Sequence, residues 1–195
     1  MNDDTTDDTN DPTRADRLLP ACRFCGTPLR TSFVDLGLSP LCQTHIEAHQ
    51  LGEMERFYPL HARVCEQCFL VQLPAFVAPD EIFGEYAYFS SFSSSWVEHA
   101  RRYTAQMIAR YRLGAHSRVV EVASNDGYLL QHFVAAGVPV LGIEPAANVA
   151  RAAEARGVPT RVDFLGEATG RAIGAEFGAA DLVLGNNVLA HVPDI

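Results

Sequence analysis

Two pairs of cysteines constrain the fold of this 195-residue chain more than any other feature. Cys22 and Cys25 form one C-x-x-C pair, Cys65 and Cys68 form a second, and 39 residues separate the pairs. Two residues between the thiolates allow both sulfurs to approach one ion from a tight turn, and two such turns complete a tetrahedral shell of four sulfurs. Zinc prefers this closed shell in structural sites. We therefore predict that these four cysteines bind a structural Zn²⁺ ion.

Other roles for the thiols stay open. The two pairs could instead be reactive or disulfide-forming dithiols, and His45, His49 or His61 could replace a ligand, although four cysteines suffice. Cys42 has no partner at ligand spacing, so we expect a packing thiol. The N-terminal segment is acidic and no apolar run approaches the length of a membrane span. We therefore expect a cytoplasmic protein, in which cysteines hold metal more often than they form disulfides.

The net charge of −9 argues against a nucleic-acid partner, because binding a phosphate backbone depends on Lys and Arg. Residues 1–17 contribute −4 of this charge and have little apolar content, so we expect a disordered tail. The remaining chain divides into an expected zinc-binding module at 18–80, a linker and helix at 81–113, and a further domain at 114–195. We expect no membrane partner and favour a monomer.

A helix is expected after the serine cluster at 90–95. Ser95 and Glu98 have the spacing of a capping box, and Gly114 is a suitable end. Apolar residues recur at helical spacing between them and predict a stripe that packs onto the next domain. These residues are Trp96, Ala100, Tyr103, Met107 and Tyr111.

Strands and helices alternate from residue 117 onward. Strands are expected at 118–123, 138–144, 160–164 and 181–185, and helices at 128–136, 146–156 and 167–177, with Gly137 and Gly157 ending the first two helices. This alternation implies a parallel sheet with right-handed crossovers, a doubly wound, Rossmann-like α/β domain.

The segment from Glu121 to Gly127 stands where the first strand turns into its helix, a position that binds ligands in open parallel sheets. Of an acidic-x-Gly-x-Gly-x-Gly pattern it keeps only Gly127, with Ala123 and Asn125 at the other glycine places. Ala is small, and Asn tolerates the left-handed region. Asp126 would repel the pyrophosphate of a dinucleotide. S-adenosylmethionine has no phosphate and carries positive charge, so this loop favours it.

Further acidic residues stand at the ends of the next two strands. Glu144 lies 23 residues beyond Glu121, close to the offset of about 20 residues at which an acid reaches a ribose diol. Asp163 and Phe164 are placed to contact an adenine. Each acid alone could be a solvated loop residue or a helix cap. Their occurrence at successive strand ends favours the cofactor.

With both motifs placed, the sequence resembles the sugar C-methyltransferases of deoxysugar biosynthesis, which methylate C3 of dTDP-linked 4-keto sugars. The resemblance runs in order through nearly the whole chain outside the tail. Its motifs are Cys22-Arg-Phe-Cys25-Gly26, Val34-Asp-Leu-Gly37 with Pro40-Leu41, Cys65-x-x-Cys68-x-Leu-Val-Gln-Leu73, Tyr86-x-Tyr88, Val120–Gly127, Gly142-x-Glu144-Pro145, Asp163-Phe164 and Asn187-x-Leu-x-His191.

Members of that family have a zinc module, a class I methyltransferase domain and a third α/β domain. The chain is similar to the first and to about half of the second, since a methyltransferase sheet usually has seven strands and four are expected here. We therefore expect an incomplete chain that is weakly active or inactive alone, because a half-sheet leaves an unpaired edge. The family's principal general base, a histidine, is expected beyond Ile195.

The resemblance also assigns site residues. Asn187 and His191 resemble active-site residues after the fourth strand, and Tyr86 resembles a substrate-contacting tyrosine. Simple packing remains the alternative for His191, near Pro193, and for Tyr86, among aromatic side chains. The expected cofactor-binding residues are Glu121, Ala123, Ser124, Asn125, Asp126, Gly127, Glu144, Pro145, Asp163, Phe164 and Asn186.

The implied reaction is methyl transfer to carbon on a nucleotide-linked keto sugar. A ketone acidifies the adjacent C–H, a base removes that proton, and the enolate attacks the sulfonium methyl. Two alternatives stay open. One is a non-catalytic zinc-binding module joined to a degenerate α/β domain, and the other is methyl transfer to a different ketone or a polyketide-type acceptor.

Overall fold

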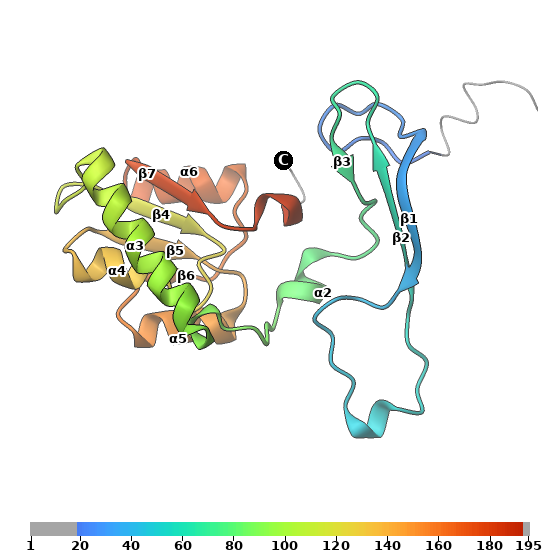
Figure 1. Cartoon of the computed structure of the whole chain (residues 1–195), viewed down its shortest axis with the longest axis horizontal. Coiled ribbons are helices and arrows are strands. Elements are labelled where there is room, and N and C mark those ends of the chain that lie inside the picture. The colour runs from blue at the N-terminus through green and yellow to red at the C-terminus, as the bar shows by residue number, and fades with distance from the viewer. Residues whose placement is uncertain (1–18, 193–195) are drawn as a thin grey trace, which may run out of the picture. The chain divides into compact units, whose positions relative to one another are not determined.

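The computed structural model describes residues 19–192 and divides them into two compact units (Figure 1). The first unit contains residues 19–41 and 46–76, and the second contains residues 42–45 and 77–192. The expected disordered tail and Pro193 lie outside the described residues. Each unit has its own buried core.

The first unit is a three-stranded antiparallel sheet with a small core. Its strands are β1 (Thr31–Ser39), β2 (Tyr58–Val64) and β3 (Val71–Gln72), in that order, with the short helix η2 (Ala48–Gln50) between β1 and β2. The core consists of Cys22, Leu29 and Cys65, with Cys68 and Leu70 packed against them. Because two of the three buried residues are expected ligands, this unit has little apolar burial apart from its cysteines.

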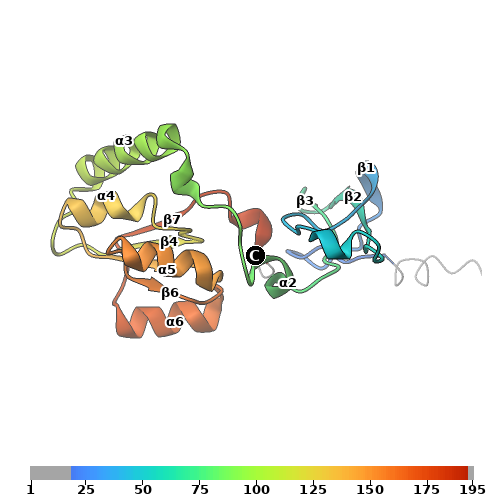
Figure 2. The same ribbon diagram turned by 90° about the horizontal axis from the view of Figure 1, so that it is seen from below.

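The second unit is an α/β domain with a parallel sheet of order β6-β5-β4-β7, so the expected doubly wound fold is confirmed (Figure 2). Three helical segments precede the sheet: α2 (Pro79–Phe83), η3 (Ser90–Phe92) and α3 (Ser94–Tyr111). The alternating part comprises β4 (Val119–Val122), α4 (Leu130–Ala135), β5 (Val140–Ile143), α5 (Ala147–Ala155), β6 (Thr160–Arg161), α6 (Glu167–Glu176), β7 (Leu182–Gly185) and η4 (Leu189–His191).

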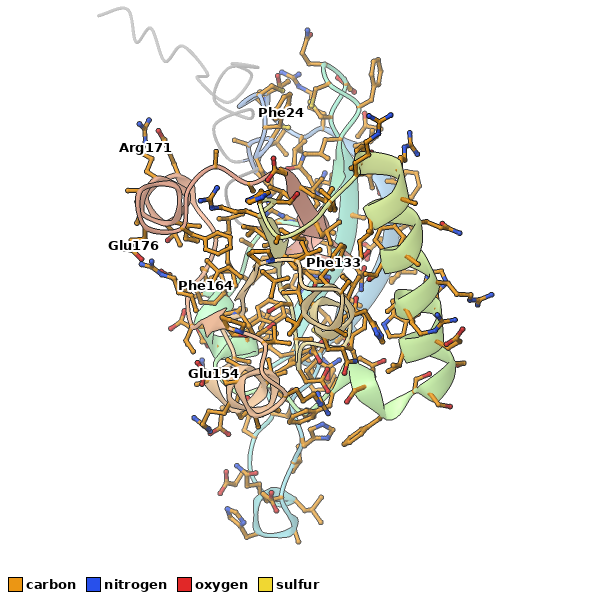
Figure 3. All side chains as sticks on the ribbon, turned by 90° about the vertical axis from the view of Figure 1, so that its left-hand side faces the viewer. Phe24, Phe133, Glu154, Phe164, Arg171 and Glu176 are labelled. Carbon is orange, nitrogen blue, oxygen red and sulfur yellow. The ribbon has the colours of Figure 1, made fainter. Side chains whose placement is uncertain are left out.

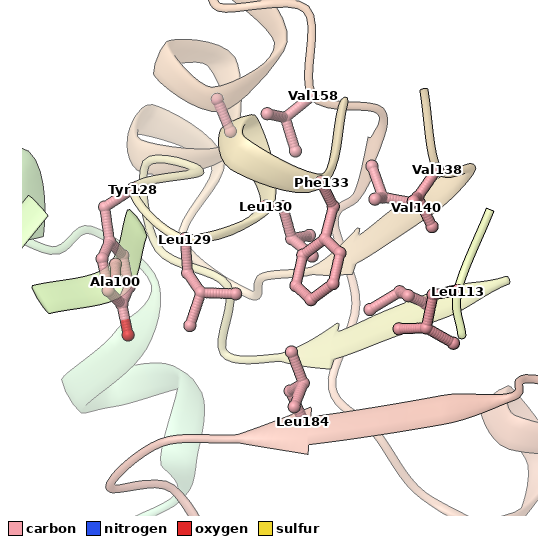
Figure 4. Close-up of a cluster of buried hydrophobic side chains, with 12 residues drawn as sticks. Ala100, Leu113, Tyr128, Leu129, Leu130, Phe133, Val138, Val140, Val158 and Leu184 are labelled. Atoms are coloured by element: carbon pink, nitrogen blue, oxygen red, sulfur yellow. The ribbon is translucent and has the colours of Figure 1, made fainter. Parts of the chain in front are cut away.

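Helices cover both faces of this sheet. α3, α4 and α5 pack on one face around the fully buried Phe133, and Ile173 of α6 packs on the other (Figure 4). Figure 3 shows Phe133 pointing into the interior, whereas Arg171 and Glu176 point outward from α6. The pattern V-V-E-V of β4 alternates between the faces, so Glu121 lies on the same side as Val119. An ionisable side chain is thereby held on a buried face of the sheet.

The start and the end of α3 differ from the prediction. The cap is Ser93, whose Oγ accepts a hydrogen bond from the Trp96 backbone at 3.3 Å, and the capping box at Ser95 was wrong. Glu98 instead pairs with Arg101 at 2.7 Å. The helix ends at Tyr111 instead of just before Gly114, and its C-terminal cap is Arg112 in the left-handed conformation (φ 56°).

The strands are otherwise close to the predicted ranges, and Gly137 and Gly157 end α4 and α5 with positive φ. The exception is β6, which contains only two residues. Its pairing with β5 stops at Arg161. Asp163 and Phe164 therefore lie in the loop after the strand rather than in it.

Candidate metal centre and cofactor site

The four cysteine sulfurs of the two C-x-x-C pairs converge on one point in the first unit. All lie within 4.8 Å of one another, with 3.6 Å between Cys22 and Cys68 and 3.5 Å between Cys25 and Cys65. A tetrahedral Zn–S bond of about 2.3 Å places sulfurs about 3.8 Å apart. The donor set and its spacing therefore fit Zn²⁺, and among the described residues the candidate metal-binding cluster is formed by these cysteines.

The two knuckles share one backbone geometry. Gly26 donates its N–H to the Cys22 carbonyl, and Phe69 donates to the Cys65 carbonyl, each at 2.9 Å. Both donors have positive φ, 74° at Gly26 and 61° at Phe69. Each turn therefore folds its chain tightly around its own pair of sulfurs, as the spacing predicted.

Hydrogen bonds to the sulfurs of Cys22 and Cys65 favour the thiolate form that binds metal. The Cys68 backbone N–H donates to the Cys65 sulfur at 3.5 Å and lowers the pKa of the Cys65 thiol. Burial alone would raise the pKa of the Cys22 thiol, but hydrogen bonds from the Cys25 backbone and the Gln72 side chain outweigh burial and lower it to about 6.

Gln72 is a residue of this centre that the sequence interpretation did not assign. Its side chain is buried, with Nε2 donating to the Cys22 sulfur at 3.1 Å and Oε1 accepting from the Arg23 backbone at 2.9 Å. It lies four residues after Cys68, where the first knuckle has the buried Leu29. The signal in the sequence that could have identified it is a polar residue, Gln72, at the position where the first knuckle has an apolar residue.

The remaining candidate ligands lie elsewhere. Cys42 is exposed, so the expectation of a packing thiol was wrong. It lies in an irregular, mostly exposed segment that follows β1, so its thiol is not buried. His61 Nε2 lies 2.8 Å from the Ser32 hydroxyl rather than in the cluster, and His45 and His49 are exposed.

In the second unit, the loop after β4 has the alternating backbone that a glycine pattern would give. Ala123, Asn125 and Gly127 all have positive φ, at 53°, 51° and 76°. Ser124 is fully buried between them, and its side chain occupies the space that a Cβ at Gly142 would need. The three predicted glycine places therefore keep their conformation although two of them hold other residues.

Two buried carboxylates support this loop. Glu144, 5% exposed, accepts from the Asn125 N–H through Oε2 and from the Ala146 N–H through Oε1, both at 2.9 Å. Glu121 is fully buried, and its Oε1 accepts from the Asn186 amide at 3.3 Å. Burial raises the pKa of both groups, that of Glu121 to about 8, and the charge of Glu144 adds to the rise at Glu121.

Glu121 Oε2 has no hydrogen-bond partner although it is buried. An unsatisfied buried acceptor is costly and points to a ligand group that completes it. S-adenosylmethionine carries a cationic amine and hydroxyls, and these residues therefore fit it. The neighbouring Tyr128 is also buried, and its pKa is raised chiefly by burial and further by the charge of Glu121.

Asp126 differs from its expected role. Its carboxylate is fully buried and pairs with Arg156 at 2.7 Å, while the Ser91 N–H donates to the same oxygen at 3.3 Å. The side chain therefore joins three segments of the unit, because a buried carboxylate needs a cation and donors. Asp163 pairs with Arg161 at 3.4 Å, and Phe164 is 39% exposed. Pro145 follows Glu144 and is half-buried.

Two of the three residues assigned by resemblance to catalysis, Tyr86 and His191, lie near one aromatic ring. Phe83 of α2 has its ring centroid 6.0 Å from that of Tyr86 and 5.9 Å from that of His191. Burial raises the pKa of Tyr86, and the charges of Cys42 and Glu144 add to this rise. Asn187 adopts positive φ just before η4. Phe83 was not predicted from the sequence, and it brings Tyr86 and His191 to the same side of the unit.

Comparison with known proteins supports the metal centre and shows the family of the chain. Residues 22–83 match the Methyltransf_13 family model, described as a zinc binding domain. C-methyltransferase NovU of Streptomyces niveus is 35% identical over 179 residues, which cover 92% of this chain. The chain belongs to the zinc-binding C-methyltransferase family. It spans 43% of the length of that relative.

Within this family, the metal-binding part of the chain is the segment that the family model recognises, and all four cysteines fall inside it. The similarity to NovU extends through the loop after β4 as well, because it covers nearly the whole chain. None of the helices among residues 19–192 is long and apolar enough to cross a membrane.

Proposed function

We propose that this chain provides the zinc-binding and cofactor-binding parts of an S-adenosylmethionine-dependent methyltransferase that methylates carbon on a nucleotide-linked keto sugar. The observation that carries the proposal is the left-handed loop of Ala123, Asn125 and Gly127 above two buried carboxylates. It occurs in a chain related to a C-methyltransferase. The sugar acceptor is the finer part of the proposal and rests on the motifs that resemble the deoxysugar enzymes.

The cofactor would be held by the carboxyl ends of the strands. Glu144 is the candidate for the ribose hydroxyls, because it ends β5 and its carboxylate is already fixed by two backbone N–H groups. Glu121 offers its free oxygen to a cationic or hydroxyl group. Asp163 and Phe164 remain the candidates for the adenine. When bound, the cofactor supplies an electrophilic methyl group to the reaction.

The residues near Phe83 are candidates for handling the acceptor. The C–H beside the ketone must lose its proton before the carbon becomes nucleophilic, and a histidine is suited to such transfer because its pKa lies near neutrality. His191 is our candidate for an acid, base or orienting role, and Tyr86 for contacting the acceptor. Asn187 completes this candidate group. The zinc shell has no open position, so its role is to stabilise the fold.

The test is a calorimetric titration of the chain with S-adenosylmethionine and, separately, with NAD. We expect uptake of about one S-adenosylmethionine per chain and none of NAD. Glu144→Gln should weaken binding about tenfold, because one acceptor for the ribose hydroxyls is lost. Glu154→Gln, on the exposed surface of α5 (Figure 3), should leave it unchanged. No uptake by the zinc-loaded chain would favour the non-catalytic alternative.

A further inference from the structure

The segment that carries Tyr86 is held against the loop after β4 by side chains of the α/β unit. We call residues 86–91 the strap, and residues 123–127, which we propose bind the cofactor, the cofactor loop. Asn148 of α5 pairs with the peptide of Tyr86 at both groups: its Oδ1 accepts from the Tyr86 N–H at 3.1 Å, and its Nδ2 donates to the Tyr86 carbonyl at 2.8 Å. The side-chain amide thus makes the pair of hydrogen bonds that the backbone of a neighbouring strand would make.

Asn125 makes a second such pairing further along the strap. Its Oδ1 accepts from the Ser90 N–H at 2.8 Å, and its Nδ2 donates to the Tyr88 carbonyl at 3.1 Å. The backbone N–H of the same residue donates to Glu144. Asn125 is 7% exposed, so these bonds are shielded from water. One residue therefore contacts both the strap and the carboxylate proposed to bind the ribose.

The end of the strap is fixed by charge. Asp126 accepts hydrogen bonds from the N–H and the hydroxyl of Ser91, and Arg156 donates to the Ser91 hydroxyl at 2.7 Å. Arg156 also pairs with the Asp126 carboxylate at 2.7 Å. The strap is thus held at both ends and in the middle by residues of the cofactor loop and α5.

We propose that Asn125 and Asn148 are positioning residues that hold the strap against the cofactor loop and so fix Tyr86 relative to the bound cofactor. The part of this proposal that concerns the cofactor rests on the proposed function. It also explains the departure from the glycine pattern at residue 125. Glycine would adopt the same φ of 51° easily, but it would lose both bonds to the strap.

The surroundings of Tyr86 agree with this role. Its pKa is raised by burial first, and then by the charges of Cys42, Glu144 and Tyr88. The charge of Glu144 therefore acts on the Tyr86 hydroxyl. The clamp at the Tyr86 peptide and the carboxylate of the cofactor site thus act on the same residue.

The first test is amide hydrogen exchange of the zinc-loaded chain, compared among wild type, Asn125→Gly and Asn148→Ala. We expect the Ser90 amide to exchange about tenfold faster in Asn125→Gly and the Tyr86 amide about tenfold faster in Asn148→Ala, since each loses its acceptor. Arg112→Gly is the matched control, because it introduces glycine at another left-handed position, the end of α3. Asn125→Asp keeps the acceptor for Ser90 and should restore much of its protection.

The second test repeats the exchange with saturating S-adenosylmethionine. In wild type the cofactor should slow exchange across the strap, whereas Asn148→Ala should bind the cofactor without slowing exchange at Tyr86. A merely structural asparagine would not couple the strap to the ligand. If the Ser90 amide in Asn125→Gly and the Tyr86 amide in Asn148→Ala exchanged at wild-type rates, the proposal that these asparagines hold the strap would be wrong. Failure of wild type to take up cofactor would overturn the proposed function, while the first test still decides the clamp.

Discussion

The two carboxylates beneath the cofactor loop differ in how their oxygens are satisfied. Glu144 has a backbone N–H donor on each oxygen, whereas Glu121 has a donor on Oε1 alone. Both are buried, and burial raises the pKa of both carboxyls, that of Glu121 to about 8. Hydrogen bonds to the ionised form offset the cost of burial, and Glu121 has fewer of them. Glu121 consequently titrates near neutral pH.

This titration should be visible in stability. The pKa of Glu121 rises from 4.5 to about 8 on folding, so between these values the folded state holds a proton that the unfolded state has released. Raising the pH through this window therefore destabilises wild type. The glutamine of Glu121→Gln does not titrate. As the pH rises through this window, the unfolding free energy of Glu121→Gln minus that of wild type should therefore increase by about 1.4 kcal/mol per pH unit. Urea unfolding of both proteins at about pH 5.5 and about pH 7.5 measures the shift, and a constant difference would contradict it.

Gln72 joins the two zinc knuckles, since it lies after the second and contacts the backbone and the sulfur of the first. Gln72→Leu removes both bonds and puts an apolar side chain where the first knuckle has Leu29. We expect zinc affinity to fall at least about tenfold, because the Cys22 thiolate loses its side-chain donor. Competition with a chromophoric chelator measures the affinity. Gln67→Leu, at an exposed position of the same knuckle, should retain wild-type affinity.

Residue types and spacing were sufficient to predict the four ligands and to identify Ala123 and Asn125 as standing at glycine places of the loop. Both depend on local chain geometry, which a short sequence window contains. The partners of Asp126 and Asn125 could not be predicted in this way. Arg156 is 30 residues from Asp126, and Ser90 is 35 residues from Asn125, so these contacts exist only once the sheet and helices have assembled.

At the scale of elements, α3 shows why a capping motif does not fix a helix start. Several serines precede the helix, and more than one could act as the cap. The chain uses Ser93, whose hydroxyl reaches the Trp96 N–H, and Glu98 pairs with Arg101 instead of returning to the cap. An ion pair between residues three apart in the helix thus competes with the capping box for the Glu98 carboxylate. The strands were predicted more closely because their apolar runs are bounded by glycines and polar residues.

The cap assignment predicts different costs for two neighbouring serines. Ser93→Ala should lower the unfolding free energy of the α/β unit by about 1 kcal/mol, because the Trp96 N–H loses its acceptor. Ser95→Ala should change it little, since alanine suits a position inside a helix. Chemical denaturation monitored by the fluorescence of Trp96, the single tryptophan of the chain, compares the two variants. Equal losses would show that Ser93 is not the cap.

At the scale of the whole molecule, the two units depend on different sources of stability. The α/β unit buries a large apolar cluster that includes Phe133, Leu130 and Val119. The zinc unit buries Cys22, Leu29 and Cys65, while β1 exposes apolar side chains along its length. Composition alone did not reveal this contrast, because apolar residues are common in both units and only the fold distinguishes buried from exposed positions.

Removal of the metal should therefore unfold one unit and spare the other. With so small a core, the free energy of zinc binding is a large part of the folding free energy of the first unit. We expect about one zinc per chain in the purified protein. A strong chelator should then raise amide exchange throughout residues 22–72 and leave residues 119–185 protected. Cys25→Ser should have the same effect without chelator, because three thiolates leave the shell incomplete. A metal-free protein that keeps protection in β1 and β2 would show that the sheet, and not the ion, stabilises this unit.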